Sequence, residues 1–352
     1  MYEALVRPLL FRLPPEPAHH LGLWGLGLMD LAPGLARWKR RAARAERSTL
    51  KVHVAGLDFP NPLGLAAGLD KDGEAIVGLF ALGFGAVEVG TVTPRAQPGN
   101  PPPRLFRIPE DRALINRMGF NNQGMHALAA RLRELEWRPG PVGVNLGKNK
   151  DTPNERAVED YVACAKALAP LSDYVVVNLS SPNTPGLRAL QEPEALARLL
   201  AAVRREVVAR PLFLKIAPDL SDEAVDEVVD VVRASDTDGI ICTNTTIARP
   251  IAHPLAGETG GLSGKPLMER STAVLRRAFR RSEGKIPLVG VGGVFDGEDA
   301  WRKICAGASL VQVYTGFIYG GPGLPTRILD ALEERVTEAG LDSVQKAVGR
   351  DV

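Results

Sequence analysis

Polar side chains stand at the ends of six short apolar segments between residues 63 and 245. They are Lys71, Thr91, Asn145, Asn178, Lys215, Thr243, Asn244 and Thr245. Amide and hydroxyl groups both donate and accept hydrogen bonds. A lysine in a buried segment is costly unless it meets an anion. If the segments are strands of one barrel, these side chains meet at one mouth and predict a site for a polar, partly anionic ligand.

Two glycine-rich segments follow the last two apolar runs, at 290–297 (GVGGVFDG) and 314–321 (YTGFIYGG). Glycine lets the backbone approach a ligand closely, and the start of a following helix offers unpaired N–H groups. In barrels of alternating strands and helices, the loops after strands seven and eight commonly bind phosphate. The glycines therefore predict a phosphorylated ligand.

The segment VNLSSPNTPGLR, residues 177–188, carries two adjacent serines after a strand-like run. Acyl transfer by this pair is disfavoured, because no histidine base stands at a strand end and no G-x-S-x-G motif is present. Lys215 has three interpretations: a cation beside a ligand, a salt-bridged or solvent-reaching lysine, or a Schiff-base lysine.

Eight short runs rich in Val, Ile and Leu recur with helical segments between them. The runs cover 63–68, 86–91, 142–147, 174–180, 212–218, 239–244, 287–293 and 309–316. Continuous apolar runs are typical of strands buried on both faces, and eight of them alternating with helices predict a (β/α)8 TIM barrel. A capping box at 152–155 and caps at Ser221 and Asp296 predict three helix starts. The alternating segment 50–60 predicts a hairpin at the barrel floor.

The first 47 residues predict a separate helical unit before a barrel domain at 48–352. Residues 15–32 read as an apolar helix and 33–47 as a basic one, and residues 1–50 carry eight Lys/Arg against four Asp/Glu. The longest apolar run, 21–29, is too short to span a bilayer but suits its surface. The alternative is a helical pair packed on the barrel.

Overall charge is nearly balanced, which disfavours nucleic-acid binding through bulk charge. Cys164, Cys242 and Cys305 are far apart, so we expect buried free thiols. No Cys/His cluster has metal-ligand spacing, and no metal is expected.

Together these motifs resemble one family. The segments AAGLDKDGE, GNPPPRLFRIPEDRALINRMGFNNQG, VNLSSPNTPGLR, KIAPDL, CTNTT, GGLSGKPL, GVGG and YTGFIYGGP are similar to those of class 2 dihydroorotate dehydrogenases, the membrane-associated, quinone-dependent class. The resemblance runs from about residue 2 to about residue 340. It implies oxidation of (S)-dihydroorotate to orotate in pyrimidine (UMP) biosynthesis, with FMN as cofactor and electrons passing to a respiratory quinone.

By matching motifs, the resemblance implies a role for each candidate residue. Ser181 is the base that removes the C5 proton; class 1 enzymes use cysteine there. The implied FMN contacts are Ala67, Gly68, Lys71, Thr91, Asn145, Asn178, Lys215, Thr243, Gly264, Gly292, Gly293, Tyr314 and Thr315. The implied substrate contacts are Lys71, Asn116, Arg117, Met118, Gly119, Phe120, Asn178, Asn183, Asn244 and Thr245.

The resemblance also assigns the N-terminal helices a role, as walls of a tunnel that leads quinone from the membrane to the flavin. His19, Arg104 and Tyr314 match tunnel positions. The implied location is peripheral, on the cytoplasmic face of a bacterial inner membrane, with the helices on the lipid surface.

Overall fold

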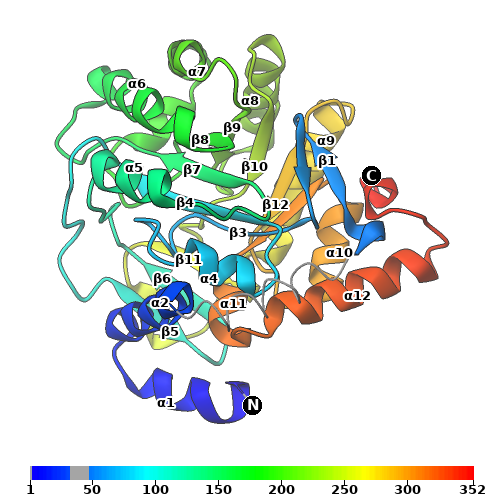
Figure 1. Ribbon diagram of the computed structural model, residues 1–352. Coiled ribbons are helices and arrows are strands. Elements are labelled where there is room, and N and C mark those ends of the chain that lie inside the picture. Colours follow the sequence, from blue (N-terminus) through cyan, green and yellow to red (C-terminus); the bar gives the residue numbers. More distant parts are fainter. Residues whose placement is uncertain (1, 32–46) are drawn as a thin grey trace.

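The structure is a computed structural model that describes residues 2–31 and 47–352 (Figure 1). Eight parallel strands close into a barrel in the order β10-β12-β13-β3-β4-β7-β8-β9. Their bounds are β3 Leu63–Leu65, β4 Ala86–Val92, β7 Val142–Leu146, β8 Tyr174–Asn178, β9 Leu212–Ile216, β10 Gly239–Cys242, β12 Leu288–Val291 and β13 Leu310–Val313. Every residue of these strands is buried, as the continuous apolar runs predict.

Helices surround the barrel and follow each strand in turn (Figure 1). Their bounds are α4 Ile76–Ala81, α5 Met125–Glu134, α6 Ala157–Leu168, α7 Pro193–Glu206, α8 Asp222–Ala234, α9 Met268–Arg281, α10 Gly297–Cys305, α11 Thr315–Gly320 and α12 Leu324–Glu338. In α8 the buried side chains are Val225, Val228, Val229 and Val232, a spacing that turns one apolar stripe to the sheet. The predicted (β/α)8 TIM barrel is confirmed.

Two of the three predicted helix starts are confirmed. The Ser221 side chain accepts a hydrogen bond from the Ala224 N–H at 3.2 Å, and Asp296 accepts one from the Asp299 N–H at 2.9 Å. The capping box at 152–155 is wrong. Pro153 is extended, with ψ 157°, so the chain makes a 3-10 turn, Asn154–Arg156, before α6 begins at Ala157.

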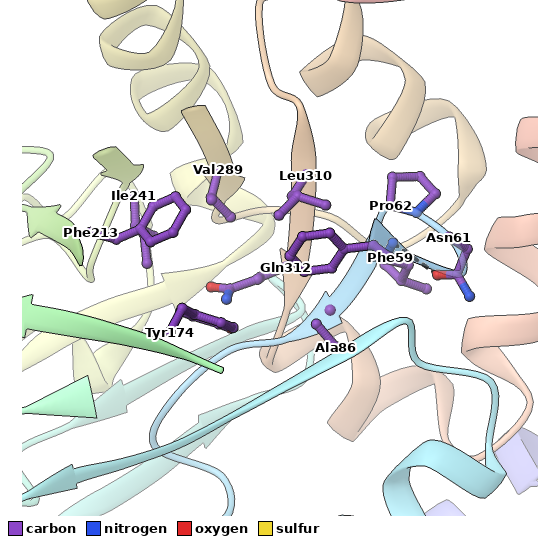
Figure 2. A pocket seen from close by; sticks show the side chains of 12 residues that line it. Phe59, Asn61, Pro62, Ala86, Tyr174, Phe213, Ile241, Val289, Leu310 and Gln312 are labelled. Carbon is purple, nitrogen blue, oxygen red and sulfur yellow. Dashed lines mark hydrogen bonds between the residues drawn. The ribbon is translucent and has the colours of Figure 1, made fainter. Parts of the chain in front are cut away.

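A β-hairpin covers the amino-terminal end of the barrel, as the alternating segment 50–60 predicts. Strands β1, Val52–Val54, and β2, Leu57–Phe59, pair antiparallel. The side chains of Phe59, Pro62, Phe213 and Leu310 line a small cavity there (Figure 2). The barrel floor is thus closed by apolar packing, which leaves the opposite end for a ligand.

The two longest connections build a second sheet over the barrel mouth. Strands β5, Leu105–Ile108, and β6, Ala113–Asn116, belong to the connection from β4 to β7. Strand β11, Gly261–Gly264, belongs to the connection from β10 to β12. The three pair antiparallel in the order β11-β6-β5. Asn116 and Gly264 are thereby held on regular strands rather than on free loops.

The N-terminal segment packs against the barrel. It consists of a π-helical turn, Tyr2–Val6, then α1, Arg7–Arg12, and α2, Pro15–Leu31. The apolar helix at 15–32 is therefore confirmed, whereas the helical stretch before it was not predicted. A Cβ on Gly78 of α4 would lie 2.4 Å from the Leu26 carbonyl oxygen, so this glycine allows α2 its close approach. Tyr2 also donates a hydrogen bond to the Ile318 carbonyl at 2.9 Å.

The same segment also carries an apolar outer surface. Its exposed apolar side chains are Leu5, Val6, Leu9, Leu13, Leu21, Trp24 and Leu28. Within residues 2–31 and 47–352, no helix is long and apolar enough to cross a bilayer. The predicted basic helix at 33–47 lies outside the described residues except for Arg47, which pairs with Asp330 and Glu333 of α12. The division at 47/48 stays a prediction.

Candidate active site

A cavity of about 90 Å³ opens at the carboxyl ends of the barrel strands. Its walls are Ala67, Gly68, Lys71, Thr91, Asn116, Met118, Gly119, Phe120, Asn178, Ser181, Pro182, Asn183, Lys215, Asn244, Thr245 and Tyr314. Fifteen of these sixteen were named as candidate site residues from the sequence, all but Pro182. The remaining candidates for FMN or substrate contacts are not among these walls: Arg117, Asn145, Thr243, Gly264, Gly292, Gly293 and Thr315.

The floor of this cavity is a chain of hydrogen bonds between buried side chains. Thr91 Oγ1 donates to Asn145 Oδ1 at 2.5 Å, and Asn178 Nδ2 donates to Thr91 Oγ1 at 2.9 Å and to Asn145 Oδ1 at 3.1 Å. Asn178 Oδ1 in turn accepts from Ser180 Oγ at 2.8 Å, and Asn244 Nδ2 donates to that serine at 3.0 Å. Asn145 does not line the cavity, but its hydrogen bonds hold Thr91 and Asn178, which do.

The two serines of the opening motif have different surroundings. Ser180 is fully buried and bonded to asparagine side chains on both sides. Ser181 is 5% exposed and lines the cavity, and its Oγ accepts a hydrogen bond from the Asn183 N–H at 3.2 Å. Asn183 Nδ2 reaches Asn116 Oδ1 at 3.2 Å, so this loop meets β6 across the mouth. Ser181 is the serine placed to contact a ligand.

Two lysines make the cavity electropositive. Burial lowers the pKa of Lys71 to about 8, although the charge of Asp72 opposes that effect. Burial also lowers the pKa of Lys215, which is 5% exposed, and here the charge of Glu88 opposes it. A partly anionic ligand would offset the cost of holding both ammonium groups out of water.

Three further candidate glycines, Gly264, Gly292 and Gly293, do not line this cavity. A Cβ on Gly293 would lie 2.4 Å from Met268 Cα, and one on Gly264 would lie 2.3 Å from the Arg112 carbonyl oxygen, so neither position has room for a side chain. Ser271 Oγ donates to the Gly292 carbonyl at 3.0 Å. Ser263 Oγ bonds Thr315 Oγ1 at 2.8 Å, which joins β11 to the start of α11.

Arg188 ties two loops of the site together, a role the sequence did not reveal. Its guanidinium donates to the Ser180 carbonyl at 3.0 Å, to Asp219 Oδ2 at 2.7 Å and to the Thr245 carbonyl at 3.0 Å. The planar fork of arginine suits three acceptors in fixed directions. The local sequence does not predict this role, because the acceptors on Asp219 and Thr245 are distant from Arg188 in the chain.

A second, larger cavity of about 670 Å³ lies between the N-terminal helices and the barrel. Apolar side chains such as Leu10, Phe11, Leu23 and Phe317 make up most of its walls. His19 also lines it, and burial lowers the pKa of His19 to about 3, so this ring is neutral at neutral pH.

Tyr314 lines both cavities, so its ring separates the polar cavity from the apolar one. Its hydroxyl donates to the Gly68 carbonyl at 3.3 Å. The structure therefore brings His19 and Tyr314, two of the three tunnel candidates, to the apolar cavity.

Arg104, the third tunnel candidate, lies outside the walls of that cavity. Its Nε is 3.1 Å from each carboxylate oxygen of Glu16 in α2, and its Nη1 donates to the Asn100 carbonyl at 2.8 Å. Arg107 lines the apolar cavity instead, with its guanidinium carbon 4.5 Å from the centre of the Phe11 ring. The sequence did not single out Arg107.

A closed (β/α)8 barrel with a polar cavity at its mouth, glycines that leave no room for side chains, and an apolar cavity beneath the N-terminal helices is the architecture of a barrel enzyme. The sequence model of the family described as dihydroorotate dehydrogenase matches residues 49–336. The chain belongs to this family.

Similar proteins extend the match over almost the whole chain. The dihydroorotate dehydrogenase (quinone) of Myxococcus xanthus is 60% identical over 99% of this chain and 97% of its own length. That of Anaeromyxobacter dehalogenans (strain 2CP-C) is 55% identical over 98% and 96%. A solved structure of DHODH from Eimeria tenella in complex with ferulenol is 38% identical, with a TM-score of 0.87 over 96% of this chain and 95% of that one. Within the family, the similarity is thus to members of the quinone-dependent class.

The clamp made by Arg188 can be tested by substitution. Arg188→Leu removes three charge-assisted hydrogen bonds, and we expect a loss of about 2 kcal/mol or more in the stability of the loops at 180–186 and 243–247. Hydrogen exchange measured on these two loops checks it. Arg156→Leu is the control, because Arg156 pairs only on the surface, with Glu159, and both side chains are more than half exposed. Equal protection in wild type and Arg188→Leu would contradict the role of the clamp.

Proposed function

We propose that this protein is a quinone-dependent dihydroorotate dehydrogenase that oxidises (S)-dihydroorotate to orotate in pyrimidine (UMP) biosynthesis. The observation that carries the proposal is the shared wall at Tyr314, between a polar cavity and a covered apolar one. A planar, charged substrate and a lipid-soluble acceptor need two chemically different compartments that meet at one redox group. The names of the curated relatives support the same activity.

The residues at the mouth fit FMN as that redox group. The glycine cradle at Gly264, Gly292 and Gly293 excludes side chains and suits a phosphate, and Lys215 offers a buried cation for the ring. Backbone and side chains of Ala67, Gly68, Lys71, Thr91, Asn145, Asn178, Thr243, Tyr314 and Thr315 complete the proposed contacts. FMN held by these residues would supply the acceptor for a hydride from C6 of the substrate and the donor of electrons to the quinone.

The side chains of the polar cavity would hold the substrate ring. Asn116 and Asn178 present amides from the ends of β6 and β8, and Asn183 and Asn244 present theirs from the loops after β8 and β10. Amides match the donor and acceptor edges of a planar imide. Lys71 would meet the carboxylate. The remaining substrate contacts that we propose are Arg117, Met118, Gly119, Phe120 and Thr245.

Ser181 is the proposed base for the C5 proton. Its hydroxyl oxygen already accepts one hydrogen bond, from the Asn183 N–H, and the cavity is the open side of the residue. In the proposed step Ser181 would take the C5 proton and give its own hydroxyl proton to solvent water, and the Asn183 N–H would stabilise the negative charge that develops on the oxygen. The polar cavity holds the substrate still, and positioning of this kind lowers the barrier to proton transfer.

The N-terminal helices would deliver quinone from the lipid surface. His19, Tyr314 and, in addition, Arg107 line the proposed route. Arg104 would act through Glu16, by holding α2 on the barrel. We propose a peripheral location on the cytoplasmic face of a bacterial inner membrane, and the exposed apolar side chains of α1 and α2 support contact with a lipid surface.

Substitution of Ser181 tests the proposed reaction. Anaerobic mixing with dihydroorotate should bleach the flavin of the wild type, and Ser181→Ala should slow bleaching about 10²- to 10⁴-fold because the base is lost. The variant should keep its FMN and its affinity for orotate. Stopped-flow absorbance of the flavin and an orotate titration measure these quantities.

Ser180→Ala is the matched control for that test. Ser180 does not line the cavity, so its loss should weaken orotate binding more than it slows the chemical step. Near-normal bleaching in Ser181→Ala would remove Ser181 as the base. A wild type that dihydroorotate does not bleach would overturn the function itself.

Trp24→Glu tests the lipid contact. Trp24 is 64% exposed on α2, and a carboxylate there should lower partition onto anionic vesicles about tenfold or more. Sedimentation with vesicles measures it. Val208→Glu is the control, since Val208 is 82% exposed on the barrel and away from α1 and α2. Equal partition of both variants would contradict a membrane role for α2.

A further inference from the structure

Lys303 is a buried lysine that lines neither cavity and that the proposed reaction does not use. It lies in α10 with no exposure to solvent. Its Nζ donates a hydrogen bond to Ser271 Oγ of α9 at 2.6 Å. Burial lowers the pKa of Lys303 to about 7, so holding this amine out of water is costly. An apolar side chain would fill the same space without that cost.

The strand beside Lys303 leaves room for its side chain. A Cβ on Gly290 of β12 would lie 3.2 Å from both Cβ and Cδ of Lys303. A larger side chain at position 290 would therefore displace the lysine, because protein interiors have little free volume. The glycine lets the stem of Lys303 lie against β12 and brings its amine to Ser271.

Ser271 connects Lys303 to the turn that follows β12. Its Oγ is 3.0 Å from the Gly292 carbonyl oxygen and 3.1 Å from the Met268 carbonyl oxygen. A serine hydroxyl has one hydrogen to donate and can also accept, whereas a lysine ammonium only donates. Ser271 therefore accepts from Lys303 and keeps its own hydrogen for these carbonyls. Lys303 thereby sets the direction of the hydrogen bond at Gly292.

The hydrogen bond at Gly292 fixes the direction of the next peptide N–H. The bond between Gly292 and Gly293 is trans, so the Gly293 N–H points opposite to the Gly292 carbonyl and away from α9. Both glycines have positive φ, 108° and 83°. Among the described residues, no group accepts a hydrogen bond from the Gly293 N–H. A free backbone donor in a glycine turn is suited to an anion such as phosphate.

A second residue of α10 holds the same turn at its other end. Asp299 lies one helical turn before Lys303, and its Oδ2 accepts a hydrogen bond from the Phe295 N–H at 2.9 Å. The same carboxylate accepts from Lys265 Nζ, at 2.7 Å and 2.8 Å. Lys265 directly follows Gly264, the last residue of β11. Helix α10 thus ties the turn after β12 to the end of β11.

We propose that Lys303 is a positioning residue for the FMN phosphate, which acts through Ser271 to hold the turn at Gly292 and so to direct the Gly293 N–H. The inference rests on the proposed function, because the cradle of Gly264, Gly292 and Gly293 is proposed to bind FMN. Riboflavin has the same ring system as FMN but no phosphate. Lys303 should therefore favour the binding of FMN over that of riboflavin.

Competition between FMN and riboflavin tests the inference. Protein loaded with FMN is equilibrated with increasing concentrations of riboflavin, and the bound flavins are separated and quantified after rapid gel filtration. The ratio of the two affinities measures what the phosphate contributes to binding. We expect Lys303→Met to lower this ratio about tenfold, since methionine cannot donate to Ser271 and the turn loses one hydrogen bond that orients it.

Ser271→Ala removes the connection itself. It should lower the ratio to a similar extent, and the double variant with Lys303→Met should lower it no further than either single variant, because both residues act through one chain of contacts.

Lys148→Met is the matched control. Lys148 is 2% exposed, and its Nζ donates to the Thr152 carbonyl at 2.7 Å, so this variant also removes a buried amine with its hydrogen bond. Lys148 follows β7, which stands four strands from β12 in either direction around the barrel. Its ratio should equal that of the wild type.

The outcomes separate the inference from the proposed function. An unchanged ratio in Lys303→Met, including equal weakening of FMN and riboflavin, would overturn the inference, and so would additive effects in the double variant. If Lys303→Met does not fold, Ser271→Ala decides alone: a ratio about tenfold lower supports the inference, and an unchanged ratio contradicts it. A wild type that binds neither flavin would overturn the proposed function and the inference with it.

Discussion

The arrangement of the candidate site depends on one buried carboxylate in the middle of the barrel. Glu88 receives hydrogen bonds from Asn145, on the neighbouring strand β7, and from Gln312, on β13 beyond β3. A carboxylate only accepts, so both amides must turn their nitrogens inward and Asn145 must turn its oxygen to the mouth. The Asn145 oxygen accepts hydrogen bonds from Thr91 and Asn178. Asn178 in turn accepts one from Ser180, in the loop that also holds Ser181.

The structure also contains two chemically different cavities, one polar and one apolar. The polar cavity is built from strand ends and from the sheet β11-β6-β5, which covers the mouth. The apolar cavity is built by α1 and α2, which the barrel holds through Arg104–Glu16, through Gly78 and through Tyr2. Tyr314 belongs to both walls, so a group bound at the mouth could exchange electrons with one compartment and receive hydride from the other.

The sequence predicted the barrel well because continuous buried runs and strand-end polar residues are strong local signals. It predicted the strand-end part of the cavity, such as Thr91, Asn178 and Lys215, because parallel strands bring their carboxyl ends together. The wall residues on the connections, such as Asn116, Phe120 and Asn183, were implied only by the resemblance to the family. It could not choose between Arg104 and Arg107. Both side chains reach the N-terminal segment: Arg104 pairs with Glu16, and Arg107 donates to the Leu10 carbonyl at 3.2 Å. Which of them lines the cavity depends on how α1 and α2 pack, which the local sequence does not show.

Glu88 and Arg188 escaped notice for related reasons. Glu88 sits inside an apolar run, and its role depends on Gln312, more than 200 residues away in the chain. Arg188 meets its acceptors only after two loops have folded towards each other. The capping box at 152–155 was wrong because the extended backbone at Pro153 delays the helix by one turn.

The choice of electron acceptor tests the central claim, that a polar substrate cavity and an apolar acceptor cavity share one redox group. The protein is reduced anaerobically with dihydroorotate, excess substrate is removed, and the flavin is then mixed with a quinone, with fumarate or with NAD. The two-cavity arrangement predicts rapid reoxidation by the quinone and little by the other two. Reoxidation by fumarate or NAD as fast as by quinone would contradict it.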